Sequence, residues 1–196
     1  YSGLQINSEV EALKKITTEI KKPITCIIGG SKISTKIDII KNLIPKFDNI
    51  IIVGAMANNI LKHKGYNIGA SLFEKNSEKI IEEIFSEVEN NSCKIYFPED
   101  VKVGKSLKDD SIQKSLNQIK NDDMILDVGS KTIQNIKSLI DNSSTILWNG
   151  PLGYFENPNF SIGSLEIAKY MGNKQGEIYS VIGGGDTCLL YTSPSP

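Results

Sequence analysis

The chain has 196 residues, a net charge of −1 and 39% hydrophobic residues, which suits one large globular domain or two small ones. The near-neutral charge argues against binding to nucleic acid or to a membrane surface through a general electrostatic field. No stretch reaches the roughly 18 consecutive apolar residues that a membrane-spanning helix needs.

The cysteines and basic residues limit the chemistry further. Cys26, Cys93 and Cys188 are odd in number and form no Cys-x-x-Cys pair, which favours reduced thiols and a cytoplasmic protein over disulfides or zinc. All 22 basic residues are lysines. Because bidentate arginine commonly grips small planar acids, this chain is better equipped to hold a polyphosphate on lysines and backbone amides. The single histidine, His63, is expected to be exposed, so neither Ser-His-Asp nor Cys-His catalysis is indicated.

Apolar runs and amphipathic patterns alternate along the chain. Strands are predicted at 24–28, 50–53, 94–97, 124–128, 145–148 and 178–182. Helices are predicted at 7–20, 32–44, 55–64, 77–89, 130–140 and 161–171. Residues 98–121 are polar and are expected to form an irregular excursion. The alternation predicts an α/β fold, a Rossmann-like three-layer α/β/α arrangement with a six-stranded, mostly parallel sheet.

A strand, a glycine turn and a helix start follow one another over residues 24–36. Gly29 and Gly30 end the strand, and Lys32 and Lys36 lie one helical turn apart at the helix start. Such a start presents free backbone N–H groups and a positive helix end to an anion. The stretch is neither a P-loop nor a Gly-x-Gly-x-x-Gly fingerprint. Taken alone, it is equally well explained as a tight turn with a solvated lysine face.

Glycine turns follow five of the six predicted strands. Ligands of such sheets bind beyond the carboxyl ends of the strands, where glycine allows a close approach. The turns together predict a nucleotide-sized crevice and favour phosphate binding over the plain-turn interpretation.

Three stretches carry a recognisable pattern: Gly29-Gly-Ser-Lys-Ile-Ser-Thr-Lys36, Leu147-Trp-Asn-Gly-Pro-Leu-Gly-Tyr-Phe-Glu156 and Gly183-Gly-Gly-Asp-Thr187. Together they resemble the phosphoglycerate kinase family, specifically its nucleotide-binding C-terminal domain. The resemblance covers residues 1–187. Residues 1–20 are similar to the interdomain helix of the family, and residues 21–187 are similar to an incomplete C-terminal domain. Residues 188–196 resemble a translated sequencing adapter and are expected to be non-native.

The resemblance implies reversible phosphoryl transfer between 1,3-bisphosphoglycerate and MgADP, giving 3-phosphoglycerate and MgATP in glycolysis. It implies a monomer with ADP or ATP as substrate and Mg²⁺ as cofactor. Lys32 and Gly185 would be catalytic, and Asp186 would bind the metal through its carboxylate oxygens. Asp186 would alternatively serve as a helix cap.

The resemblance also assigns nucleotide binding to a larger set of residues: Gly30, Ser31, Lys36, Gly54, Ala55, Leu72, Met124, Leu126, Asn149, Gly150, Pro151, Glu156, Gly183, Gly184, Asp186 and Thr187. Lys36 and Asn149 would contact the phosphates, Gly183–Gly185 and Thr187 would cradle them, and Glu156 would accept the ribose hydroxyls. The adenine slot would be lined by Gly54, Ala55, Leu72, Met124 and Leu126. Plain core packing is the alternative for the last three residues.

Two other function classes are considered. The family's basic N-terminal domain, which grips 3-phosphoglycerate, is absent from this sequence, so the chain alone is expected to bind nucleotide without turnover. A non-catalytic nucleotide-binding module is therefore the alternative hypothesis. A Rossmann oxidoreductase is disfavoured, because the Gly-x-Gly-x-x-Gly turn and a ribose-binding acid after the second strand are both lacking.

Overall fold

The structure of the protein is a computed structural model, and it describes residues 20–183. Its main sheet contains five parallel strands in the order β3-β2-β1-β7-β8. The strands are β1 (Ile24–Ile28), β2 (Asn49–Ile52), β3 (Lys94–Tyr96), β7 (Thr145–Asn149) and β8 (Tyr179–Gly183). The helix predicted at 7–20 and the tail at 188–196 lie outside the described residues.

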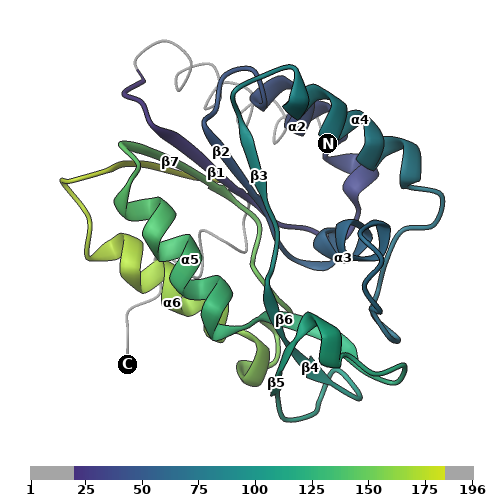
Figure 1. Cartoon of the computed structure of the whole chain (residues 1–196). Helices are drawn as coiled ribbons and strands as arrows, with labels where there is room; N and C mark the ends of the chain where they lie inside the picture. The colour runs from purple at the N-terminus through teal and green to yellow at the C-terminus, as the bar shows by residue number, and fades with distance from the viewer. Residues whose placement is uncertain (1–19, 184–196) are drawn as a thin grey trace, which may run out of the picture.

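Helices cover both faces of the main sheet (Figure 1). One face packs against α2 (Ile37–Leu43), α3 (Ala55–His63) and α4 (Glu78–Glu89), and the other against α5 (Ser130–Asp141) and α6 (Ile162–Gly172). The predicted α/β class and the layered arrangement are therefore confirmed. His63, at the end of α3, is exposed as expected.

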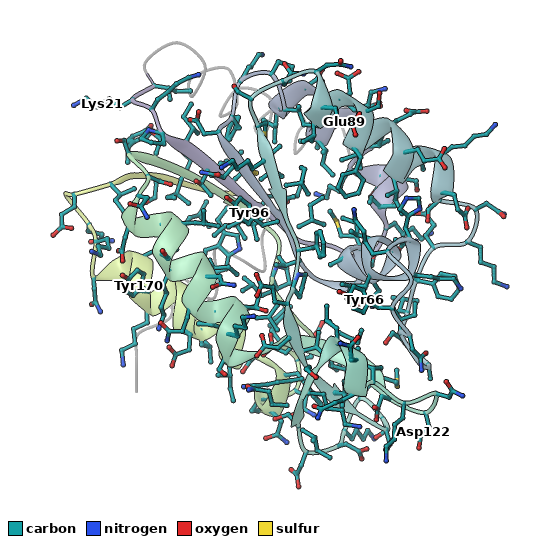
Figure 2. All side chains as sticks on the ribbon, in the orientation of Figure 1. Lys21, Tyr66, Glu89, Tyr96, Asp122 and Tyr170 are labelled. Atoms are coloured by element: carbon teal, nitrogen blue, oxygen red, sulfur yellow. The ribbon has the colours of Figure 1, made fainter. Side chains whose placement is uncertain are left out.

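Alternating side chains of each central strand pack into two separate hydrophobic cores, one on each face of the sheet. Ile28 and Ile50 pack with the α2–α4 layer, whereas Ile27, Ile51 and Trp148 pack with the α5–α6 layer. Successive side chains of a strand point to opposite faces, so a strand that is covered on both faces is buried at every position, as β1 is. Its one polar residue, Thr25, shares a hydrogen bond with the Ser143 hydroxyl. Figure 2 shows Tyr96 near the centre of the molecule and Tyr170 on the α6 layer.

The prediction of six strands in one sheet was wrong at residues 124–128. This segment forms β6 (Met124–Val128), which belongs to a separate antiparallel sheet with β4 (Asp100–Gly104) and β5 (Ile112–Ser115) in the order β5-β4-β6. The excursion expected at 98–121 is thus largely regular, with β4, β5 and the 3₁₀ turn η2 (Leu116–Gln118). Val101 and Val103 of β4 are buried, while Lys102 between them is only half-buried. A polar-looking run is therefore a strand that is buried at every position except Lys102.

The helix predicted at 32–44 begins later and less regularly than expected. Lys32 has extended backbone, with φ −127° and ψ 116°, and precedes the 3₁₀ turn η1 (Ile33–Thr35). Lys36 separates η1 from α2. The first α-helical residue is therefore Ile37, and Lys32 belongs to the connecting loop instead of the helix.

Other expectations concern the cysteines and the membrane. Cys26 and Cys93 are free and buried, and burial raises the pKa of both thiols, that of Cys93 to about 11. Such thiols act as small apolar packing groups. Within residues 20–183, every helix is too short or too polar to cross a membrane.

Candidate functional site

Three glycine turns meet at the carboxyl ends of β1, β2 and β7. The N–H of Gly29 donates to the carbonyl of Asn149 at 2.8 Å, and the N–H of Gly54 donates to the carbonyl of Leu152 at 3.2 Å. Gly54 has φ +71° and Gly150 has φ +90°, the left-handed region that favours glycine. A Cβ on Gly150 would lie 2.7 Å from the carbonyl carbon of Gly29. The turns therefore touch through backbone atoms, and the site has a main-chain wall.

A cavity of about 500 Å³ lies beside these turns, a volume within the range of small-molecule sites. Its lining includes many residues that the sequence assigned to nucleotide binding: Gly30, Ser31, Gly54, Ala55, Leu72, Met124, Leu126, Pro151 and Glu156. They come from the first and second turns, the small sheet and the segment after β7. Regions far apart in the sequence thus form a single hollow.

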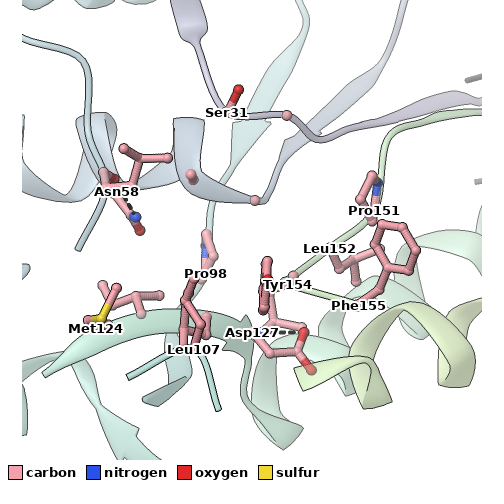
Figure 3. A pocket seen from close by; sticks show the side chains of 18 of the residues that line it. Ser31, Asn58, Pro98, Leu107, Met124, Asp127, Pro151, Leu152, Tyr154 and Phe155 are labelled. Atoms are coloured by element: carbon pink, nitrogen blue, oxygen red, sulfur yellow. Dashed lines mark hydrogen bonds between the residues drawn. The ribbon is translucent and has the colours of Figure 1, made fainter. Parts of the chain in front are cut away.

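Several other residues also line the cavity but were not predicted as site residues from the sequence: Asn58, Pro98, Leu107, Ile125, Asp127, Val128, Leu152, Gly153, Tyr154 and Phe155. Figure 3 shows Asn58 on the wall near Met124, while Pro151, Leu152 and Phe155 form the opposite side. Leu107 could have been suspected as an isolated apolar residue in a polar loop. Asn58 carried a weaker signal, a polar residue on the buried side of α3.

Two leucines at the cavity are unusually exposed. Leu72 is 61% exposed and Leu107 is 41% exposed, although both line the hollow. Met124 and Leu126 are half-buried on the small-sheet wall. Exposed apolar side chains around a cavity are suited to cover a flat apolar ligand. Plain core packing therefore does not describe Leu72.

Four predicted residues gather beside the Gly30 turn. The Nζ of Lys36 donates to Oδ1 of Asn149 at 3.1 Å. A Cβ placed on Gly30 would lie 3.8 Å from Cε of Lys36, and one on Gly183 would lie 3.1 Å from Nδ2 of Asn149. Gly184, Gly185, Asp186 and Thr187 follow Gly183 and lie outside the described residues. A lysine, an amide and two glycines are thus held together where β1, β7 and β8 end.

Lys32 is placed differently from Lys36. It is exposed on the loop before η1, whereas Lys36 is half-buried beside Gly30; neither lysine is among the residues that line the cavity. The charge of Lys32 acts on the carboxylate of Glu74, which also accepts hydrogen bonds from Ser34. The sequence predicted free backbone N–H groups at this turn. That expectation is wrong for Ser34, because its N–H already donates a hydrogen bond to the Glu74 carboxylate.

Two buried polar side chains lie on the cavity wall. Asp127 is 2% exposed, and burial raises its pKa to about 6, although its carboxylate accepts hydrogen bonds from the N–H groups of Gly163 and Val128. Asn58 donates from Nδ2 to the carbonyl of Leu72 at 2.8 Å. Its Oδ1 has no hydrogen-bond partner among residues 20–183.

Metal ligands are sparse in the part of the chain that the structure describes. It contains no group of three or more His, Cys, Asp or Glu side chains that could hold a metal ion. The metal ligand predicted from the sequence, Asp186, lies outside these residues.

Comparison with known proteins identifies the family. The sequence model of the family "Phosphoglycerate kinase" matches residues 1–193. The chain is 40% identical over 190 residues to phosphoglycerate kinase of Wolbachia sp. subsp. Drosophila simulans, covering 95% of this chain and 48% of that protein. It is 37% identical over 191 residues to phosphoglycerate kinase of Maricaulis maris, covering 95% and 47%.

A solved structure agrees with these sequence relatives. The structure of phosphoglycerate kinase from Coxiella burnetii superimposes with a TM-score of 0.86 at 35% identity, covering 94% of this chain and 48% of that chain. This chain thus spans about half the length of the curated relatives that it matches. The chain belongs to the phosphoglycerate kinase family.

Proposed function

We propose that this chain is the nucleotide-binding half of a phosphoglycerate kinase. Such an enzyme moves a phosphoryl group reversibly between 1,3-bisphosphoglycerate and MgADP, giving 3-phosphoglycerate and MgATP. The observation that carries the proposal is the single cavity of about 500 Å³ at the glycine turns, which brings Leu72, Met124 and Glu156 together. Lys36 lies beside Gly30, which lines the cavity, and donates a hydrogen bond to Asn149; neither of these two side chains lines the cavity itself.

The geometry supports a division of the cavity between parts of the nucleotide. The adenine would lie against the apolar wall of Leu72, Met124 and Leu126, and Glu156 would accept hydrogen bonds from the ribose hydroxyls. Lys36 and Asn149 would hold the phosphates beyond Gly30. A wall of backbone atoms allows a flat ring and a phosphate chain to approach closely.

The chemistry needs charge neutralisation more than proton transfer. The attacking oxygen is already an anion in either direction of the proposed reaction, so a general base is not required. Catalysis must then come from alignment of the two substrates and from stabilisation of the charge on the moving phosphoryl group. We assign that stabilisation to the ammonium of Lys32 and to the backbone N–H of Gly185.

We propose Asp186 as the side chain that binds Mg²⁺. A carboxylate is a suitable ligand for this hard cation, which would neutralise phosphate charge when bound. The described carboxylates at the cavity do not fit that role. Asp127 is buried and its carboxylate accepts two backbone N–H groups, and Glu156 is assigned to the ribose.

Isothermal titration calorimetry with ADP tests the binding half of the proposal. We expect the 196-residue chain to bind ADP, and Lys36→Met to weaken that binding about tenfold through loss of a charge-assisted phosphate contact. The matched control is Lys41→Met, because Lys41 lies on α2 and pairs with Glu83. Absence of ADP binding, or an equal effect of the two variants, would refute the proposal.

A chimera distinguishes a kinase half from a binding module. The chain alone should consume no ATP with 3-phosphoglycerate, since the resemblance assigns the acid substrate to the other domain. Joined to the N-terminal half of the Wolbachia relative, and with that relative's own C-terminal residues in place of residues 188–196, the chain should turn over in a coupled assay. A chimera that folds and binds ADP without turnover would favour the non-catalytic module instead.

A further inference from the structure

Glu74 links the cavity wall to the loop that carries Lys32. Its Oε2 accepts the backbone N–H of Ser34 at 3.0 Å, and its Oε1 accepts the Ser34 hydroxyl. Ser34 lies in η1, two residues after Lys32. The side chain of Glu74 therefore fixes the first turn after the exposed lysine.

The backbone of Glu74 is fixed as firmly as its side chain. The N–H of Glu74 donates to Oδ1 of Asn59 at 3.2 Å, and Nδ2 of Asn59 donates to the carbonyl of Glu74 at 2.7 Å. Asn59 is 3% exposed on α3. Glu74 itself lies in the loop before α4, but two hydrogen bonds tie its backbone to α3.

Residues 69–74, which we call the strap, connect this anchor to the cavity. Leu72 of the strap lines the cavity, and its carbonyl accepts a hydrogen bond from Asn58 at 2.8 Å. Ser71 accepts the N–H of Ile125 from the small sheet at 2.8 Å. The strap is therefore a continuous, hydrogen-bonded segment. It joins the part of the cavity where the adenine is proposed to bind to the loop that carries Lys32.

We propose that Glu74 is a positioning residue, which holds the Gly30–Ser34 loop so that Lys32 is set for the terminal phosphoryl group that ATP transfers. The inference rests on the proposed nucleotide-binding function. Glu74 does not touch the reacting atoms in this account. It acts through Ser34, whose two hydrogen bonds lower the pKa of the Glu74 carboxyl and keep it charged, with a smaller contribution from Lys32.

The sign of the effect separates this role from simple electrostatics. A carboxylate near a phosphate site repels phosphate and shields Lys32, so its removal should strengthen ATP binding if charge were its only contribution. A positioning role predicts the opposite, because the lysine loop loses its anchor. Glutamine separates the two effects, since it is neutral and can still accept the Ser34 N–H.

The test measures ATP and ADP binding by calorimetry for the wild-type chain, Glu74→Ala and Glu74→Gln. We expect Glu74→Ala to weaken ATP binding about tenfold and ADP binding by less than about twofold, because only the terminal phosphoryl group of ATP uses Lys32. Glu74→Gln should bind ATP within about twofold of the wild type. Glu78→Ala is the charge-matched control, an exposed glutamate at the start of α4.

Each contrary result has its own meaning. Unchanged or tighter ATP binding by Glu74→Ala would overturn the positioning role, as would equal losses for ATP and ADP. If the wild-type chain binds neither ligand, the proposed function itself fails. Should Glu74→Ala unfold, as judged by circular dichroism, Ser34→Ala removes the hydroxyl donor from the other side and should weaken ATP binding selectively, by about threefold.

Discussion

The carboxylate of Asp127 accepts a hydrogen bond from the backbone N–H of Gly163 at 3.0 Å, across 36 residues of sequence. Gly163 lies in the first turn of α6, so the contact places a buried acid at the positive end of that helix. It also ties the small sheet to the α6 layer at the floor of the cavity. Close packing is required here, because a Cβ on Gly163 would collide with the carboxylate at 2.5 Å.

Asp127 should make the protein less stable as the pH rises from about 4 to 6. Burial raises its pKa from 3.8 to about 6, so the folded protein holds the proton where the unfolded chain releases it. Between those values the folded state binds more protons, and the free energy of unfolding falls with rising pH. Asp127→Asn should remove about 2–3 kcal/mol of this dependence, measured by urea unfolding at pH 4 and pH 7.

Asp38→Asn is the control for that comparison, because Asp38 is exposed in the first turn of α2. It should leave the pH dependence unchanged. A wild-type chain whose stability did not fall between pH 4 and pH 6 relative to Asp127→Asn would contradict the assignment to Asp127.

Asp123 should show the opposite dependence. Burial opposes its ionisation, but contacts at 2.7 Å with Lys105 and Lys114 outweigh that effect and lower the pKa of its carboxyl. Its stabilising contribution is therefore complete above about pH 4 and is lost as the pH falls below that value. Asp123→Asn should cost about 3 kcal/mol at neutral pH, because it leaves Lys114 in a half-buried site without its partner.

Asp122 offers a neighbouring control for Asp123. It is 72% exposed and contacts Lys105 alone among the residues described, so Asp122→Asn should change stability little. The measurement is urea unfolding at pH 7 and pH 3. Equal effects of the two substitutions would show that burial does not set the strength of this network.

Gly150 should resist substitution more than a glycine of the same backbone conformation elsewhere. Gly150 has φ +90° and Gly176 has φ +89°, so alanine is strained at both positions. Only Gly150 is crowded, because nothing lies within 4 Å of a Cβ on Gly176. Thermal unfolding should show a loss of about 1 kcal/mol for Gly176→Ala and at least about 2 kcal/mol more for Gly150→Ala. Similar losses would mean that the turns do not need their close contact.

Glu156→Gln should weaken ADP binding through the ribose. If Glu156 accepts the ribose hydroxyls, the wild-type chain should prefer ADP over 2′,3′-dideoxy-ADP by about tenfold, and the variant should lose most of this preference. Calorimetry with both nucleotides measures the ratio. The control is Glu166→Gln, an exposed residue of α6 that pairs with Lys137. A preference that persists in Glu156→Gln would assign the ribose to another residue.

The main sheet was predictable because its central strands are covered on both faces. Runs such as Ile24–Ile28 and Ile50–Val53 contain no charged residue, so length and flanking glycines identify them. β6 was predicted as a strand, but its apolar residues do not indicate which strand it pairs with or whether that pairing is parallel or antiparallel. Its partner β4 was hidden, since Asp100 and Lys102 make that segment look like a loop.

The candidate site was predictable where the backbone dominates it. Gly30, Gly54 and Pro151 follow strand ends, and strand ends meet at one edge of a parallel sheet. Leu107 and Glu74 could not be placed this way, because their positions depend on the small sheet and on hydrogen bonds across 40 residues of sequence. Those contacts are set by tertiary packing and leave no local periodicity.

The main-chain wall formed by the turns at Gly29, Gly54 and Gly150 has a consequence for inhibitor design. Its shape does not depend on side chains, so selection for drug resistance has few routes to alter it without unfolding the protein. Leu72 and Leu107 on the opposite side are exposed and can be exchanged more freely. A compound whose affinity comes from the peptide groups should therefore keep its potency across variants, whereas one that depends on the leucines should select escape mutants.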